Sequence, residues 1–151
     1  MPSTSTAGAS GSVFAVDANA LIAALLRGKA MRIVTAPRLA FFTTVRTTWE
    51  VERYLPELAA ELSRRGVRIE AEEVRATFRS LPIVALPESF YESQLAQARS
   101  LMEARDPDDV DILALALRLQ VPLWTNDRHF RGLSGVQALT TVDMLSVLQS
   151  S

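Results

Sequence analysis

Three residue types that build many functional sites are missing or scarce in this sequence. Its 151 residues include no cysteine, one histidine, His129, and one lysine, Lys29. The lack of cysteine excludes disulfide scaffolds, thiolate zinc sites and cysteine nucleophiles. A single histidine excludes a two-histidine metal site within the chain. We therefore expect any metal site to be built from oxygen ligands, which select hard cations.

A long hydrophobic run and a strong net charge are absent as well. No apolar run approaches the roughly 20 residues that cross a bilayer, so no membrane association is expected. Residues 1–12 are rich in small and polar residues but lack the features of a signal peptide, and we interpret them as a flexible tail. A net charge of −1 does not point to nucleic acid. The composition fits the reducing cytoplasm, where we expect the protein.

Short apolar runs alternate with amphipathic stretches along the rest of the chain. The apolar run at 13–16 predicts a buried strand, and apolar positions spaced by three or four predict a helix at 44–65. Pro56 is expected to kink or divide that helix. We expect Asn19 and Thr141 to cap the helices that follow them. The other strands expected are 39–43, 83–86, 121–125 and 137–140, and the other helices are 20–27, 70–80, 87–104, 107–120 and 141–149.

This alternation predicts an α/β sandwich around a mainly parallel sheet, formed as one domain by residues 13–151. Two acids directly follow apolar strands of that sheet: Asp17 comes after 13–16, and Asp127 comes after 121–125. Ligands of open parallel sheets bind beyond the carboxyl ends of the strands. The two carboxylates are therefore expected to converge on one point.

A further group of acids opens the helix expected from residue 107. Asp109 shares a helical face with the apolar Leu113, so its carboxylate is expected to face the core, where a bound cation would compensate its charge. Asp111 lies about 200° around the helix from Asp109 and cannot point into the same site. Asp108 is better explained as an acid that stabilises the helix N-terminus. Asp106 can reach the site from the preceding loop.

Other polar side chains near these acids are candidates for supporting roles. Asn19 and Thr125 stand at strand ends, where each can hydrogen-bond an acid, a water or a phosphate, or serve only as a cap or turn residue. Glu50 is a further candidate acid on the helix at 44–65. Arg46 and Arg53 flank Glu50 at i−4 and i+3 and are candidates to contact phosphate; the alternative is a surface ion network.

Arg128 adjoins Asp127 and is a third candidate phosphate contact. His129 follows two residues after Asp127; we expect it at the surface and assign it no role as a base. Several carboxylates without cysteine and with little histidine suit two-metal phosphodiester chemistry, in which one ion activates water and the other stabilises the leaving oxygen.

The pattern resembles the PIN-domain nucleases, including the VapC-type toxins of bacterial toxin–antitoxin pairs. The resemblance covers nearly the whole chain, from about residue 13 to 148. Its most specific part is the spacing from Asp109 to the segment from Thr125 to Phe130. The matching pieces are 16–19, Glu50, 105–109, 113–117 and 124–130.

The resemblance implies a three-layer α/β/α fold and RNA cleavage that depends on Mg²⁺ or Mn²⁺. It implies that the acids of the site are both catalytic and metal-binding, with Glu52 as the fallback for the acid of the second helix. It also implies RNA as the substrate, with a cognate antitoxin and a second copy of the chain as possible partners. The acids it selects are Asp17, Glu50, Asp109 and Asp127; Asn19, Thr125 and Asp106 would support them, and Arg46, Arg53 and Arg128 would bind RNA.

Four other functions fit part of the pattern. A non-catalytic PIN-like module that binds RNA or protein would be expected to have lost some of the acids. A receiver domain would require a lysine after a late strand, and Lys29 is misplaced for it. A haloacid-dehalogenase-like phosphatase would require an acid where Asn19 stands. A Rossmann-type nucleotide-binding domain would require a glycine-rich loop, which the six glycines do not form.

Overall fold

A five-stranded, all-parallel sheet forms the centre of the molecule, with the strand order β3-β2-β1-β4-β5. The structure is a computed structural model that describes residues 12–102 and 107–150, so the expectations for residues 1–11 and for Asp106 lie outside it. The predicted mainly parallel α/β sheet is confirmed. The strands are β1 (Val13–Val16), β2 (Ala40–Thr44), β3 (Ile83–Leu86), β4 (Leu123–Trp124) and β5 (Ala138–Leu139).

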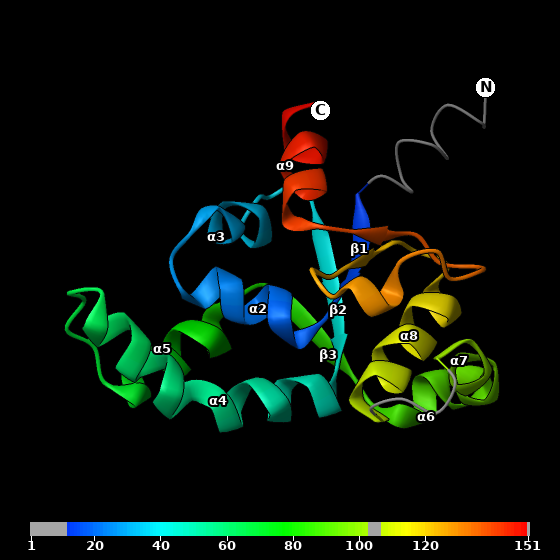
Figure 1. The fold of residues 1–151 in the computed structure, drawn as a ribbon, viewed down its shortest axis with the longest axis horizontal. Coiled ribbons are helices and arrows are strands. Elements are labelled where there is room, and N and C mark those ends of the chain that lie inside the picture. Colours follow the sequence, from blue (N-terminus) through cyan, green and yellow to red (C-terminus); the bar gives the residue numbers. More distant parts are fainter. Residues whose placement is uncertain (1–11, 103–106, 151) are drawn as a thin grey trace.

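Helices cover both faces of this sheet, which gives the three layers (Figure 1). None of the helices in the described part of the chain is long and apolar enough to span a membrane. One face carries α2 (Ala18–Leu25), α3 (Lys29–Val34), α4 (Val45–Arg64), α5 (Ala71–Ser80) and α9 (Thr141–Gln149), and the other carries α6 (Glu88–Tyr91), the 3-10 turn η1 (Glu92–Gln94), α7 (Leu95–Met102) and α8 (Pro107–Leu119).

Alternation along the strands divides the apolar residues between two cores. Phe14 and Val16 of β1 pack with the α2–α5 side, whereas Ala15 packs with the α6–α8 side. On the first side, the ring of Phe41 lies 5.8 Å from that of Phe14 and 5.5 Å from that of Trp124, between ring centroids. These contacts tie three neighbouring strands together and fix the positions of their carboxyl ends.

The strand order reverses between β1 and β4. The chain moves outward from β1 to β2 and β3 through helices on one face, and then crosses back to β4 through helices on the other face. At such a reversal, the connections after the two central strands diverge and leave a crevice at the sheet edge, where ligands of α/β proteins bind. Asp17 follows β1, and Thr125 follows β4, at the carboxyl ends of these two neighbouring strands. We call this place the β1–β4 edge.

Two predicted helix caps are wrong by one or two residues. Asp17, not Asn19, caps α2, because its carboxylate accepts a hydrogen bond from the Ala20 backbone N–H at 3.1 Å. Thr140, not Thr141, caps α9, where its hydroxyl accepts from the Asp143 N–H and the Asp143 carboxylate accepts from the Thr140 N–H.

Two helix boundaries also differ from the prediction. Helix α4 continues through Pro56, so the predicted division is wrong, while the alternative of a kink stays a prediction; buried residues on both sides, such as Val51 and Leu58, hold both halves against one core. The helix predicted at 87–104 is instead divided into α6, η1 and α7 within its described part. Tyr91 lies at the division with its ring buried and its hydroxyl donating to Asp111.

Candidate active site

Asp17 is the most deeply placed acid of the site. It is 6% exposed and lies between the end of β1 and the first turn of α2. One carboxylate oxygen accepts from the Ala20 N–H, and the other accepts from the Asn19 side-chain amide at 3.1 Å and from the Thr125 hydroxyl. A buried carboxylate with every oxygen engaged is held in one orientation.

The protonation of Asp17 is strongly affected by its surroundings. Burial raises its pKa to about 7, from an ordinary value of 3.8, because a charged carboxylate loses solvation there. The hydrogen bonds from Thr125 and Ala20 lower the pKa and offset part of this effect, whereas the negative charges of Asp109 and Asp127 raise it further. The repulsion indicates that the three acids lie near one another and that a cation between them would relieve it.

Thr125 connects two of these acids. Its buried hydroxyl donates to Asp17 and accepts from the backbone N–H of Asp127 at 3.0 Å. Its own backbone N–H pairs with Leu139 of β5, so the β-sheet fixes the residue. Thr125 therefore links Asp127 to Asp17 through hydrogen bonds, and its supporting role in the site stays a prediction.

Asn19 joins the same two loops from the other side. Its amide nitrogen donates to Asp17, and its amide oxygen accepts from the Asn126 N–H at 3.1 Å. The Asn126 side chain in turn accepts from the Thr141 N–H at 2.8 Å, at the start of α9. The loops after β1 and β4 and the start of α9 are thus connected by a continuous set of hydrogen bonds.

Asp109, Asp127 and His129 form a group whose ligand atoms lie within 4.8 Å of one another. Asp109 comes from α8, whereas Asp127 and His129 come from the turn after β4. Asp109 and Asp127 are partly buried and His129 is exposed. The structure therefore brings Asp109 and Asp127 together across two elements that are distant in the sequence, whereas the convergence predicted from the strand ends was that of Asp17 with Asp127.

His129 is the residue of this group that the sequence analysis missed. Asp127 caps the 3-10 turn η2 (Arg128–Phe130) by accepting from the His129 N–H at 2.9 Å, which brings the two side chains together, with His129 Nδ1 at 3.3 Å from the Asp127 carboxylate. The available signal in the sequence was the spacing, because a residue two positions after an acid that caps a turn lies close to that acid. The expectation that any metal site here is built from oxygen ligands stays a prediction, and an imidazole nitrogen also stands beside the carboxylates.

The donor atoms of this group suit a divalent cation. Two carboxylates offer the hard oxygen ligands that Mg²⁺ and Mn²⁺ prefer, and an imidazole nitrogen is acceptable to Mn²⁺. Asp17 lies outside the group itself; burial is the main cause of its raised pKa, and the charges of Asp109 and Asp127 add to it. The residues present therefore fit a cation bound at the β1–β4 edge.

The acids of α4 have different surroundings from those at this edge. Glu52, the fallback for Glu50, forms ion pairs with Arg75 at 3.4 Å and Arg79 at 3.2 Å, both on α5. Its carboxylate is therefore engaged away from the β1–β4 edge. Glu50 is partly buried in the second turn of α4, and it is not part of the cation-compatible group found among the described residues. Its catalytic role stays a prediction.

The three arginines proposed to contact phosphate differ in their exposure to solvent and in the contacts that hold their side chains. Arg46 Nε lies 3.6 Å from the carboxylate of Asp111, while 43% of the Arg46 side chain is exposed. Asp111 is buried and also accepts from Tyr91, so it faces α4 and α6, as expected for an acid turned away from the Asp109 side of α8. Arg53 and Arg128 are exposed.

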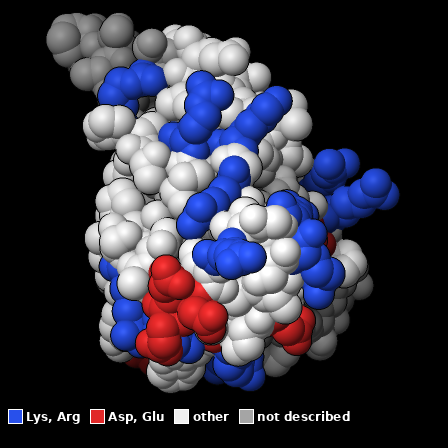
Figure 2. Space-filling view, turned by 90° about the vertical axis from the view of Figure 1, so that its left-hand side faces the viewer, with Lys and Arg blue, Asp and Glu red and all other residues white. Residues whose placement is uncertain are grey.

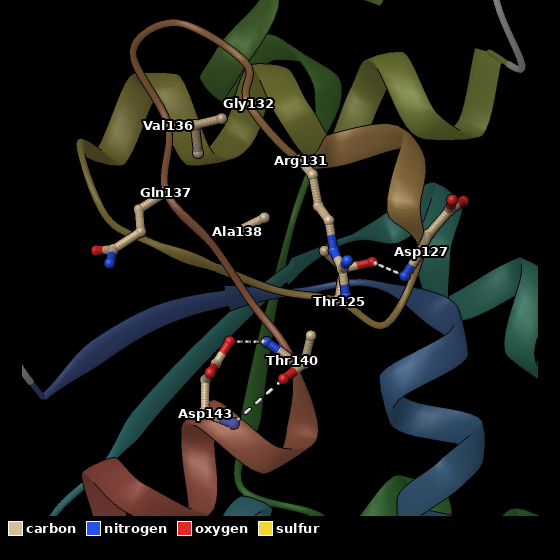
Figure 3. A pocket seen from close by; sticks show the side chains of 9 residues that line it. All are labelled: Thr125, Asp127, Arg131, Gly132, Val136, Gln137, Ala138, Thr140 and Asp143. Carbon is tan, nitrogen blue, oxygen red and sulfur yellow. Dashed lines mark hydrogen bonds between the residues drawn. The ribbon is translucent and has the colours of Figure 1, made fainter.

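A pocket of about 510 Å³ lies beside the acids, between the turn after β4 and the start of α9. Figure 3 shows Arg131 extending from η2 toward Thr125, with the carboxylate of Asp127 pointing away from Arg131. Arg131 contributes the positive charge of the pocket. The residues that line it are Thr125, Asp127, Arg131, Gly132, Val136, Gln137, Ala138, Thr140 and Asp143.

The fold and site together define an α/β/α protein with acids gathered at the reversal point of a parallel sheet. A family model described as a PIN domain matches residues 15–149, and the chain belongs to this family. PIN domains are generally nucleases, and PIN nucleases typically use divalent metals. Comparison with curated protein sequences found no match. The family predicted from the sequence is confirmed, and the VapC-type assignment within it stays a prediction.

Proposed function

We propose that this protein is a metal-dependent ribonuclease that hydrolyses RNA phosphodiester bonds at the β1–β4 edge of its sheet. The observation that carries the proposal is the convergence of Asp109 and Asp127, with His129, next to the buried Asp17. Carboxylates placed at the end of parallel strands are otherwise costly, because they repel one another and lose solvation. Their presence in one place favours cation-dependent catalysis over a purely structural role.

Each residue has a distinct task in this proposal. Asp17, Asp109 and Asp127 would hold Mg²⁺ or Mn²⁺, which when bound supplies Lewis-acid activation of water and stabilisation of the leaving oxygen. Thr125 and Asn19 keep Asp17 in one orientation through their hydrogen bonds. His129, which is 61% exposed at its side chain, lies where its ring can contact substrate while it orients Asp127. Glu50 is proposed as the fourth acid.

The distribution of charge supports a phosphate-rich substrate despite the net charge of −1. Residues 18–49 contain no acid and five basic residues, Arg27, Lys29, Arg32, Arg38 and Arg46. Figure 2 shows that basic side chains spread over the face where α3 and α5 lie in Figure 1, while acids gather in its lower part. Segregated positive charge attracts the RNA backbone even when the whole chain is nearly neutral.

Cleavage of RNA is the direct test. The purified protein is incubated with short single-stranded RNA of mixed sequence, with Mn²⁺, with Mg²⁺ or with a chelator. We expect cleavage with either metal and none with chelator, and a loss of more than about tenfold in Asp17→Asn, Asp109→Asn and Asp127→Asn, since tenfold corresponds to only 1.4 kcal/mol. Glu57→Gln, which removes an exposed acid of α4, is the matched control and keeps the wild-type rate. Equal rates in Asp109→Asn and wild type would contradict the proposal.

Binding of the cation is tested separately, by melting without RNA. A ligand that binds only the native state stabilises it by RT ln(1 + [L]/Kd), so Mn²⁺ is expected to raise the melting temperature of the wild type and of Glu57→Gln. The increase is expected to shrink in Asp109→Asn and Asp127→Asn. A melting temperature that does not respond to millimolar Mn²⁺ or Mg²⁺ would count against a formed cation site.

We also propose that the protein acts as the toxin of a toxin–antitoxin pair, working as a homodimer that a cognate antitoxin inhibits. The support is the sequence resemblance together with the intact acids, which disfavour the alternative of a non-catalytic RNA- or protein-binding module. Expression in a bacterial host separates the possibilities. Growth arrest by the wild type but not by Asp109→Asn supports a toxic ribonuclease, and arrest by both variants supports a binding module.

A further inference from the structure

Helix α4 presents an unusual combination of side chains to solvent. Trp49 is 63% exposed, whereas the other tryptophan, Trp124, is fully buried. Arg46, Trp49 and Arg53 are spaced at i, i+3 and i+7, so they lie along one face of α4. An indole exposed to this extent gains little from the core and is available to a ligand.

These three residues line a shallow depression of about 500 Å³ together with Glu52. The charge of Glu52 is compensated by its ion pairs with Arg75 and Arg79 of α5, at 3.4 and 3.2 Å. The depression therefore offers a flat aromatic surface between two guanidinium groups, with its acid already paired. We call Arg46, Trp49 and Arg53 the α4 platform.

One end of the α4 platform approaches α8, the helix that supplies Asp109. Arg46 lies in the first turn of α4, which begins where β2 ends at the carboxyl edge of the sheet. Its guanidinium contacts Asp111 on α8, two residues from Asp109, at 3.6 Å. Figure 1 shows the first turns of α4 and α8 side by side below that edge, and the two helices are in contact. Arg46 thus stands between Trp49 and the helix that supplies Asp109.

We propose that the α4 platform is a nucleobase subsite for single-stranded RNA, in which Trp49 stacks on an unpaired base of the bound strand. Arg46 and Arg53 contact phosphates on either side of that base. This inference rests on the proposed ribonuclease function and specifies the form of its substrate. An exposed aromatic ring flanked by arginines is the arrangement by which proteins hold single strands with little sequence preference.

The chemistry favours a single-stranded nucleic acid over a duplex or a protein. In a duplex, neighbouring bases already cover both faces of each base, so none is available to stack on an indole. A protein-docking surface would be expected to offer a continuous apolar core, whereas here one aromatic ring lies among charged groups. Asp111 holds Arg46 in place, so its guanidinium is positioned before a phosphate arrives.

Tryptophan fluorescence tests the α4 platform in the cleavage-deficient Asp109→Asn background. Short single-stranded RNA is expected to quench the exposed Trp49, while the buried Trp124 supplies a constant background signal. Trp49→Ala is expected to weaken binding by about 5- to 150-fold, and Trp49→Phe, which keeps an aromatic face, by less. Tyr54→Ala is the matched control, because Tyr54 is a 39% exposed aromatic of the same helix outside the α4 platform. A duplex of the same sequence is expected to bind more weakly.

The salt dependence separates the arginines from the indole. Arg46→Ala and Arg53→Ala are each expected to lower the slope of log affinity against log salt by about 0.7, the value for one phosphate contact of a single strand. Trp49→Ala is expected to weaken binding without changing that slope. A wild-type slope retained in both arginine variants would overturn the phosphate contacts.

The failure of this inference is distinguishable from failure of the proposed function. If the wild type cleaves RNA while Trp49→Ala retains the wild-type affinity and KM, the ribonuclease stands and the α4 platform is not a base subsite. If Trp49 fluorescence responds to protein concentration but not to RNA, the surface is a contact between copies of the chain, and the inference is overturned. If the wild type neither binds nor cleaves RNA, both proposals fail.

Discussion

The hydroxyl of Thr125 donates a hydrogen bond to the carboxylate of Asp17, a residue 108 positions earlier in the chain. The same hydroxyl accepts from the Asp127 N–H, so one buried side chain sets two acids of the site relative to each other. This relationship exists because β1 and β4 are neighbours in the sheet, with Ala15 paired to Leu123 and Val16 to Trp124. The pairing of β1 with β4 therefore determines how these residues of the site are arranged.

Replacement of Thr125 tests this positioning role. Thr125→Val removes the hydroxyl and leaves the Asp17 carboxylate and the Asp127 N–H without this hydrogen-bond partner. The expected cost is about 1–3 kcal/mol in free energy of unfolding. We expect the rate of RNA cleavage to fall by about tenfold or more. Thr125→Ser retains the hydroxyl and is expected to restore most of the rate at similar substrate affinity. A Val variant as active as the Ser variant would show that the hydrogen bonds do not matter for catalysis.

The buried charge of Asp17 is expected to cost stability as the pH rises. Its folded-state pKa of about 7 lies above the ordinary value of 3.8, so the native state retains the proton more strongly than the unfolded state does. The stability that Asp17 contributes is present in full below about pH 4 and is lost as the pH rises through about 7.

Asp17→Asn should remove this pH dependence. Relative to the variant, the wild type is expected to lose about 2–3 kcal/mol in free energy of unfolding between about pH 5 and pH 8, in buffer with a chelator. Denaturant unfolding at several pH values measures the difference, and groups that titrate equally in both proteins cancel. If the free energies of unfolding of the two proteins changed equally with pH, burial would not raise the pKa of Asp17.

Glu50 and Glu52 offer a matched pair on one helix. Glu50→Gln is expected to reduce cleavage by more than about tenfold if Glu50 is the fourth acid of the site. Glu52→Gln breaks the ion pairs with Arg75 and Arg79 and is expected to keep catalysis but to destabilise the contact of α4 with α5 by about 1 kcal/mol or less. Cleavage rates and unfolding curves of both variants separate the roles, and the reverse outcome would make Glu52 the catalytic acid.

Arg131 is expected to bind substrate rather than to take part in bond cleavage. It lines the pocket of about 510 Å³ beside the acids and provides its positive charge. Arg131→Ala is expected to raise KM and to lower the salt slope of RNA binding by about 0.7, with kcat nearly unchanged. Arg99→Ala, which removes a basic residue of α7 outside this pocket, serves as the control. A fall in kcat at constant KM would instead place Arg131 in the transition state.

The sequence by itself determined the class of fold and selected the acids that the structure places at the ends of β1 and β4 and on α8. An acid directly after an apolar run marks the end of a buried strand, and the helical spacing of Asp109 with Leu113 predicts a core-facing carboxylate. Both are local relationships with a fixed period, so no knowledge of distant contacts is needed. The positions of Asp17, Asp109 and Asp127 follow from them.

Only the tertiary structure decided which side chains meet. Asp17 caps α2, whereas Asn19 lies inside that helix and its side chain accepts from the backbone N–H of Asn126, 107 residues away. Nothing local distinguishes Glu50 from Glu52; the packing of α5 against α4 does so by supplying the arginines that pair with Glu52. His129 became part of the acidic group through a turn that Asp127 itself caps. These contacts depend on how the elements pack, and hydrophobic periodicity specifies the elements but not the polar partners across them.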